Sequence, residues 1–218
     1  GDPKKNELGS REDVDKVLSQ IAGKPFTVQS VKKTQRRKNP APPFITSSLQ
    51  QEASRKLNLT PKRTMMLAQQ LYEGVELREE GSVGLITYMR TDSLRISEEA
   101  LAAAGEVIRS RYGEKYYPGQ PRRYKPKANA QDGHEAIRPS NVALYPELVE
   151  HDLTKDQYRL YKLIWNRFIA SQMENAVYDV TAIEAACENQ VFRATHQSVA
   201  FAGFTAIYEE GKDDEQEA

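Results

Sequence analysis

The chain has 218 residues, of which 39% are hydrophobic and 28% are charged, a composition typical of a folded globular protein. It has no run of about 18 apolar residues, and no basic segment followed by an apolar one opens it, so neither a membrane span nor a secretory signal is predicted. The single cysteine, Cys187, excludes a disulfide framework, and three widely spaced histidines argue against a Cys/His metal site. We expect an intracellular protein. Because the chain starts at Gly1 without a Met, we expect it to be part of a longer protein.

The 31 basic and 31 acidic residues cancel, but they are unevenly distributed. Ten basic residues and one acidic residue lie between Lys24 and Arg63, and eight basic and three acidic residues lie between Arg109 and Arg138. The C-terminal residues 209–217 are mostly acidic. This asymmetry indicates a face that meets phosphates, although a solvated charged surface produces the same pattern.

The first elements have clear boundary signals. Ser10 before an amphipathic pattern predicts a capped helix that ends at Gly23. Residues 26–38 are rich in β-formers that alternate with polar residues, which predicts a half-exposed strand. The proline-rich residues 39–43 end this strand as an extended linker.

A helix-turn-helix is predicted next. Residues 47–57 and 61–72 have helical patterns, with Thr60 placed to cap the second helix and Pro61 at its first position. Residues 82–89 then resemble a strand, which favours a winged-helix arrangement.

The second half begins with helices and ends with strands. We expect a helix from Ser97 to about Arg111, a surface loop over residues 113–131 and a long helix opened by a Thr154/Gln157 capping box. The apolar side chains of this long helix are expected in the core, namely Tyr158, Tyr161, Ile164, Trp165, Phe168 and Ile169. Period-two patterns predict three antiparallel strands, at 178–187, 190–197 and 199–209.

One strand before the helices and several after them indicate an α+β fold. The expected organisation is an N-terminal helix and linker at 1–25, a composite β-rich domain at 26–42 plus 175–212, an inserted helical domain at 43–174, and an acidic tail at 213–218. The two chain crossings between the domains would allow a hinge.

Residues 84–93, Gly-Leu-Ile-Thr-Tyr-Met-Arg-Thr-Asp-Ser, are the most informative segment for chemistry. On a strand, Tyr88 and Arg90 would project from one face while Met89 points into the body. An adjacent guanidinium favours the ionised form of a phenol and can neutralise a phosphate under attack. A Tyr/Arg pair by itself is usually only a structural contact.

This segment resembles the active-site signature of type IA DNA topoisomerases, the group of bacterial topoisomerase I and reverse gyrase. Residues 43–53, Pro-Phe-Ile-Thr-Ser-Ser-Leu-Gln-Gln-Glu-Ala, and residues 131–140, Gln-Asp-Gly-His-Glu-Ala-Ile-Arg-Pro-Ser, resemble the same family in the same order. The resemblance implies a tyrosine-bearing helical domain inserted in a β-rich gate.

By this resemblance, Tyr88 would be the nucleophile that holds the 5′ phosphate of a cleaved strand, and Arg90 would orient the scissile phosphate. His134 and Arg138 are four residues apart, so on a helical turn they would share a face and could grip neighbouring phosphates. The remaining expected DNA contacts are Thr46, Ser47 and Ser48 at a helix N-terminus, and Arg36 and Arg37 in the first basic stretch.

The family resemblance also implies a separate metal-binding (TOPRIM) domain that supplies an acidic magnesium site and a general acid. No such motif occurs in this sequence, so we expect no metal bound here, Mg²⁺ in the complete enzyme, and no relaxation of supercoiled DNA by this chain alone. The expected partners are single-stranded or underwound DNA and the remaining domains of the enzyme, in the bacterial cytoplasm near the nucleoid.

Two other functions fit parts of the pattern. A winged-helix module could bind DNA without chemistry, in which case Tyr88 would be dispensable. A tyrosine recombinase would carry a late tyrosine in a helical bundle, which the early, strand-borne Tyr88 disfavours.

Overall fold

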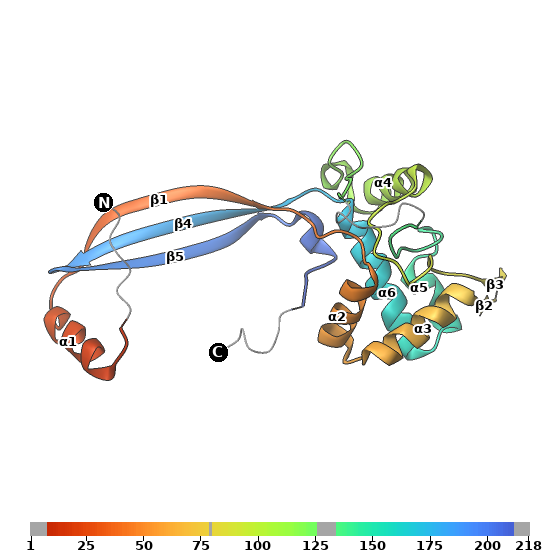
Figure 1. The fold of residues 1–218 in the computed structure, drawn as a ribbon. Helices are drawn as coiled ribbons and strands as arrows, with labels where there is room; N and C mark the ends of the chain where they lie inside the picture. The colour runs from red at the N-terminus through yellow and green to blue at the C-terminus, as the bar shows by residue number, and fades with distance from the viewer. Residues whose placement is uncertain (1–7, 79, 126–133, 212–218) are drawn as a thin grey trace. The chain divides into compact units, whose positions relative to one another are not determined.

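The computed structural model describes residues 8–78, 80–125 and 134–211. The predicted acidic tail, part of the predicted loop and the start of the third motif block, residues 131–133, lie outside these ranges. The chain forms two compact units. The sheet unit comprises Gly1–Arg37 and Val177–Phe201, and the helical unit comprises Lys38–Ala176 and Ala202–Ala218 (Figure 1).

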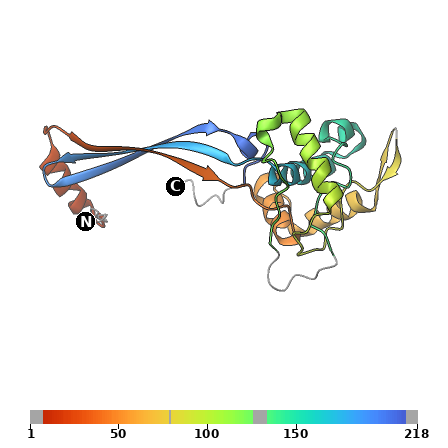
Figure 2. The ribbon, with the colours of Figure 1, turned by 90° about the horizontal axis from the view of Figure 1, so that it is seen from above.

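The sheet unit contains one helix and three long strands. These elements are α1 (Arg11–Ile21), β1 (Thr27–Lys38), β4 (Ala176–Cys187) and β5 (Gln190–Phe201). The strand order is β1-β4-β5, and the strands run side by side in both views (Figures 1 and 2). Ser10 caps α1 by accepting a hydrogen bond from the Asp13 amide, as predicted. The helix buries none of its residues.

The strands of this unit pair in antiparallel fashion. β4 and β5 pair from Val177 with Phe201 to Cys187 with Gln190, across a turn at Glu188, which has a positive φ of 54°. Ser30 on β1 donates to Glu184, and Gln35 donates to Asp179, so β1 also runs opposite to β4. The strand predicted at 26–38 is confirmed, but the expected half burial is wrong, since nearly all of its side chains are exposed.

The C-terminal part of the predicted sheet is wrong. Residues 190–201 form one continuous strand because every position except Ala200, where the register shifts, has a partner on β4. The chain then turns into the short 3₁₀ helix η3 (Gly203–Ala206). Two strands therefore follow the helices instead of three.

The helical unit carries the remaining elements. These are α2 (Thr46–Leu57), α3 (Pro61–Glu73), β2 (Val75–Leu77), β3 (Gly81–Val83), α4 (Glu98–Tyr112), η1 (Glu114–Tyr116), α5 (Pro146–Val149), η2 (Glu150–Asp152) and α6 (Lys155–Ser171). The predicted caps Thr60, Ser97 and Thr154 each accept a hydrogen bond from a backbone amide three residues ahead.

Helix α6 is the centre of the helical unit. Its apolar face buries Tyr161, Ile164, Trp165, Phe168 and Ile169, as predicted, while Tyr158 is only partly buried. The hydroxyl of Tyr161 donates to the Leu144 carbonyl, and the indole of Trp165 donates to the Val142 carbonyl. Helices α2 and α3 pack against α6, so the helix-turn-helix rests on this core (Figure 1).

The strand predicted at 82–89 is wrong for most of its length. Only β2 and β3 form a short antiparallel hairpin, which ends at Val83. Leu85 and Ile86, which follow the hairpin, are buried because this segment runs through the helical unit. Its Ile86 forms only an isolated bridge, with Pro139, so the segment is not part of a sheet. Within the described ranges, no helix is long and apolar enough to cross a membrane.

Candidate active site and DNA-contacting residues

The three motif blocks meet in the helical unit. Phe44 forms an isolated antiparallel bridge with Ile137, and Ile86 forms another with Pro139. The Thr46 hydroxyl donates to the Met89 carbonyl at 2.8 Å. Segments that are far apart in the sequence therefore form one structure around residues 84–93.

Helix α3 and residues 136–140 position this segment from two sides. The Leu85 amide donates to the Leu71 carbonyl at 2.7 Å, and the Thr87 amide donates to the Arg138 carbonyl at 2.9 Å. Gly84 passes so close to α3 that a β-carbon there would lie 2.7 Å from the Tyr72 carbonyl oxygen, so glycine is required by close approach.

Tyr88 is 39% exposed, whereas its neighbour Met89 is completely buried. The expected directions of these side chains are therefore confirmed, although the backbone is not a regular strand. The ring of Tyr88 lies near two other rings, with its centroid 5.3 Å from that of Tyr72 and 6.4 Å from that of His134. These rings restrict the Tyr88 side chain, which stays accessible to a substrate.

A cleft of about 530 Å³ adjoins the tyrosine segment; Tyr88 does not line it, but His134, which packs near Tyr88, does. Its lining includes the predicted residues Thr46, Ser47, Arg90 and His134. Arg90 and His134 are exposed, and neither forms an ion pair with another described residue. The cleft also meets the first turn of α2, whose free amides favour an anion. This arrangement fits a phosphate.

The three hydroxyl residues of the first block have different roles. Thr46 donates to the carbonyls of Met89 and Thr91 and accepts from the Thr91 amide, so it joins α2 to the tyrosine segment. Ser48 accepts from the Ile45 amide and caps the helix. Ser47 is exposed in the cleft and is the hydroxyl most open to a ligand.

The helical geometry predicted for His134 and Arg138 is wrong. Residues 134–138 are extended and not helical, because Ile137 pairs with Phe44, so His134 and Arg138 do not share a helical face. The guanidinium of Arg138 forms an ion pair with Glu135 at 2.8 Å and donates to the Pro139 carbonyl. The side chain of Arg138 is only 12% exposed and is held inside the unit, and its expected contact with a phosphate stays a prediction.

Arg36 and Arg37 lie on β1, in the other unit. Both side chains are exposed, and Arg36 stands 6.0 Å from the ring centroid of Tyr178. They form no ion pair with any described residue of the sheet unit.

Sequence reasoning missed three residues around the tyrosine. Gln50 and Asp92 line the cleft and belong to the first and second motif blocks, so those blocks contained the signal. Tyr72 lies outside all three blocks, and only the packing of α3 brings it to Tyr88.

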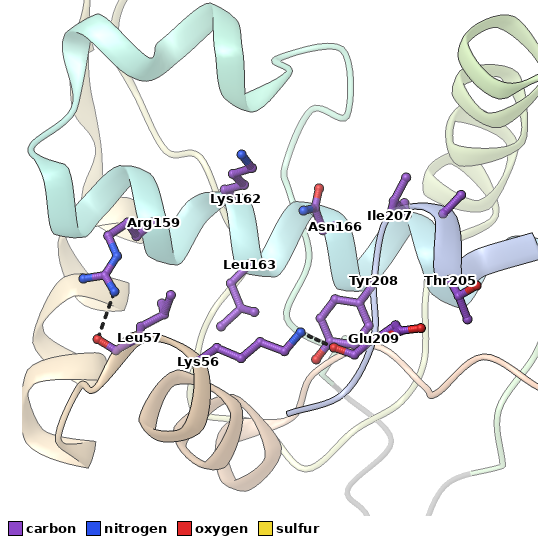
Figure 3. Close-up of a pocket in the computed structure, with 11 residues that line it drawn as sticks. Lys56, Leu57, Arg159, Lys162, Leu163, Asn166, Thr205, Ile207, Tyr208 and Glu209 are labelled. Carbon is purple, nitrogen blue, oxygen red and sulfur yellow. Dashed lines mark hydrogen bonds between the residues drawn. The ribbon is translucent and has the colours of Figure 1, made fainter. Parts of the chain in front are cut away.

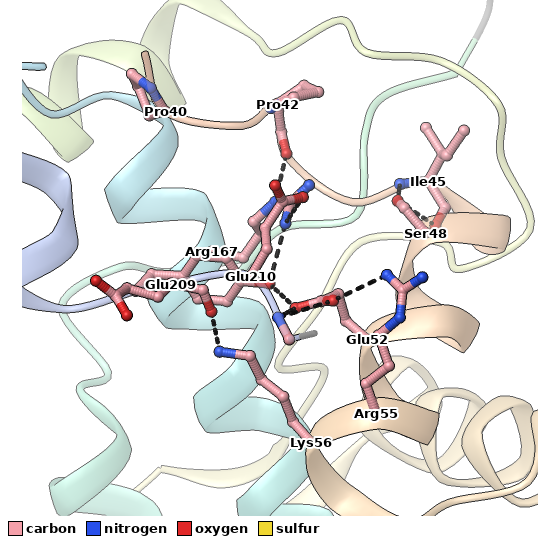
Figure 4. A network of polar contacts seen from close by, with 12 residues as sticks. Pro40, Pro42, Ile45, Ser48, Glu52, Arg55, Lys56, Arg167, Glu209 and Glu210 are labelled. Atoms are coloured by element: carbon pink, nitrogen blue, oxygen red, sulfur yellow. Dashed lines mark hydrogen bonds and ion pairs between the residues drawn. The ribbon is translucent and has the colours of Figure 1, made fainter. Parts of the chain in front are cut away.

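A buried polar network joins α2, α6 and the C-terminal segment (Figure 4). Glu52, from the first motif block, and Arg167 are 2% and 3% exposed. Glu52 accepts from the Tyr208 hydroxyl and from the Gly211 amide, while Arg167 donates to the Pro42 carbonyl and to the Tyr208 hydroxyl. Burial raises the pKa of Tyr208 well above its usual value, so this phenol stays protonated.

A further cavity, of about 420 Å³, lies between the end of α2, α6 and residues 205–209 (Figure 3). Its basic side chains already have partners. Lys56 donates to the Glu209 carbonyl, and Arg159 donates to the Leu57 carbonyl at 3.2 Å. Both bonds hold backbone together, so they stabilise the fold.

Comparisons with known proteins identify the family to which this chain belongs. The DNA topoisomerase family profile matches residues 2–218, and the chain belongs to this family, the bacterial type IA DNA topoisomerases.

The chain is also similar to a solved structure, full-length topoisomerase I from Thermotoga maritima. The TM-score is 0.78 at 35% sequence identity, over 97% of this chain and 36% of that enzyme. The chain therefore spans about a third of the length of this relative. Among the described residues, no group of three or more His, Cys, Asp or Glu could hold a metal ion.

Proposed function

We propose that this chain contributes the nucleophile and part of the phosphate site of a type IA topoisomerase. The observation that carries the proposal is the position of Tyr88, which is partly exposed and packs near His134, a residue that lines a cleft together with Arg90. DNA is the substrate that family membership supports.

In the proposed reaction, the Tyr88 oxygen attacks the phosphorus of a phosphodiester and loses its proton. The bond between phosphorus and the 3′ oxygen breaks, and that oxygen leaves as a 3′ hydroxyl after taking up a proton. The 5′ phosphate remains on the tyrosine. Since the phosphoester conserves the bond energy, the 3′ hydroxyl can reverse the step without a nucleotide cofactor.

The residues of the cleft have distinct proposed roles. Arg90 holds two oxygens of the phosphate with its planar fork and offsets the charge that develops during attack. His134, which lines the same cleft as Arg90, adds a second donor. Ser47 and the free amides of α2 complete the anion site.

In this proposal, the other domains of the enzyme supply the metal site and the general acid. Magnesium and the general acid would belong to other domains, and strand passage would use the sheet unit as part of a gate that acts on single-stranded or underwound DNA. We therefore keep the expectation that the chain alone does not relax supercoiled DNA, and we propose that the enzyme acts at the nucleoid in the cytoplasm.

Tyr88→Phe tests this function in the enzyme that contains the remaining domains. Labelled DNA attached to protein is detected on a denaturing gel. We expect the adduct to disappear while DNA affinity stays nearly unchanged, because only one oxygen is removed. Tyr158→Phe, on α6, is the matched control and should keep the adduct. An adduct that persists without the Tyr88 hydroxyl would favour the alternative of a non-catalytic winged-helix module at this position.

A further inference from the structure

A second hollow lies on the other side of Arg90. It has a volume of about 640 Å³, runs along α3, and is lined by Met65, Met66, Gln69, Glu73, Gln50 and Arg90. Gln50 and Arg90 also line the cleft beside Tyr88. The two hollows therefore adjoin across these side chains, and we call the second one the α3 groove.

The α3 groove occupies one face of its helix from the first turn to the last. Its residues recur at helical spacing, while the opposite face buries Thr64, Leu67 and Leu71 in the core. At a rise of 1.5 Å per residue the face is roughly 18 Å long. It is thus an extended surface that leads away from the active-site arginine.

The chemistry of the α3 groove differs from that of the cleft. Met66 is 43% exposed, and the groove wall combines two flexible thioethers and amide side chains with the charged side chains of Lys62, Glu73 and Arg90. The carboxylate of Glu73 is occupied by the Gln69 amide. Lys62 stands at the far end of the helix. An apolar surface with amide groups suits unstacked bases, whose flat faces pack on it and whose edges accept or donate hydrogen bonds.

We infer that the α3 groove binds the bases of the DNA segment that stays attached to Tyr88 after cleavage. This inference rests on the proposed function. In that reaction the 5′ phosphate remains on Tyr88, so the nucleotides that follow it must leave the tyrosine across the helical unit. The anionic end of this segment fits the cleft, and the α3 groove begins at the same arginine.

Photo-crosslinking tests which nucleotides lie in the groove. Met66 is replaced by p-benzoylphenylalanine in the full chain, and the probe is a single-stranded oligonucleotide with a 5′ phosphate. We expect crosslinks to the nucleotides next to the 5′ phosphate. Crosslinks only to the 3′ end, or no crosslink under conditions in which the oligonucleotide is bound, would overturn the inference.

An affinity comparison provides the matched control. Met66→Glu should weaken binding of the 5′-phosphorylated oligonucleotide by roughly five- to tenfold, because a charge replaces a stacking surface. Leu148→Glu places the same charge on α5, at another exposed apolar residue that is not in the groove, and should change affinity less than twofold. Equal effects of the two substitutions would contradict a groove-specific contact.

Adduct formation separates this inference from the proposed function. In the enzyme with its remaining domains, Met66→Glu should lower the adduct yield for DNA that extends several nucleotides past the break, but not for DNA that ends one nucleotide past it. If yield is unaffected at both lengths, the groove binds another part of the enzyme instead and the inference fails while Tyr88 keeps its role. If the unaltered enzyme forms no adduct at Tyr88, the proposed function fails.

Discussion

The ring of Tyr72 packs edge-on against the ring of Tyr88, with centroids 5.3 Å apart and the planes at 63°. Tyr72 is on the last turn of α3, and the neighbouring Leu71 carbonyl accepts a hydrogen bond from Leu85. The end of α3 thus holds both the backbone and the side chain of the tyrosine segment.

Removing the Tyr72 ring should reduce the rate of adduct formation. An edge-on aromatic pair contributes about 0.5–1.5 kcal/mol, which corresponds to about a two- to twelvefold change. We expect a loss of this size for Tyr72→Ala and near-normal rates for Tyr72→Phe, which keeps the ring. The measurement is the time course of adduct formation on denaturing gels. Equal loss in both variants would assign the effect to the Tyr72 hydroxyl.

Substitution of Gly84 should displace the backbone of the tyrosine segment. Gly84→Ala brings a β-carbon within 2.7 Å of the Tyr72 carbonyl, so α3 and the tyrosine segment must separate. We expect a loss of about 1–3 kcal/mol in the free energy of unfolding, measured by urea denaturation. Gly9→Ala is the control, since nothing lies within 4 Å of a β-carbon there. Similar losses for both variants would contradict the close contact.

The buried network should be far more sensitive than a surface ion pair. Arg167→Ala removes a buried guanidinium that pairs with Glu210 and donates to the Pro42 carbonyl and the Tyr208 hydroxyl, so we expect a loss of about 3–5 kcal/mol in the free energy of unfolding. Arg78→Ala removes a guanidinium that is 74% exposed and pairs with Asp152, and should cost about 1 kcal/mol or less. Thermal unfolding of both variants compares the two environments. A small effect at Arg167 would mean that the network does not hold the C-terminal segment.

Alkaline pH should destabilise the helical unit. Burial raises the pKa of Tyr124 to about 12, and its hydroxyl donates to the Ser171 carbonyl at 2.8 Å. The unfolded chain releases this proton near pH 10, so the stabilisation is fully present below about pH 10 and is lost as pH rises toward 12. Unfolding temperature against pH should show this loss, and Tyr124→Phe should flatten it. An unchanged slope in the variant would refute the assignment.

Salt dependence should distinguish the two basic stretches. Arg36 and Arg37 are free of ion pairs within the described sheet unit, so Arg36→Gln with Arg37→Gln should reduce the slope of log affinity against log salt for single-stranded DNA. Each lost phosphate contact changes this slope by about 0.7. Arg123→Gln should change it less, because this side chain already bonds Glu98. The reverse order of effects would assign DNA contact to the second stretch.

The sequence was sufficient to predict an interaction where its two partners lie close together in the chain. The caps at Ser10, Thr60, Ser97 and Thr154 were predicted because each hydroxyl bonds an amide three residues away. The buried face of α6 was also predicted from a local signal, because its apolar residues repeat with the helical period.

The sequence also determined the chemistry of this protein, since three short blocks name the family and the residue types that can meet a phosphate. Only the tertiary structure decided what those residues do. Arg138 was expected at the phosphate, but its side chain lies inside the helical unit, paired with Glu135. Tyr72 carried no sequence signal, but its ring packs on Tyr88. Their partners come from segments that meet through the packing of α2, α3 and α6, and no local pattern encodes which distant side chain will arrive there.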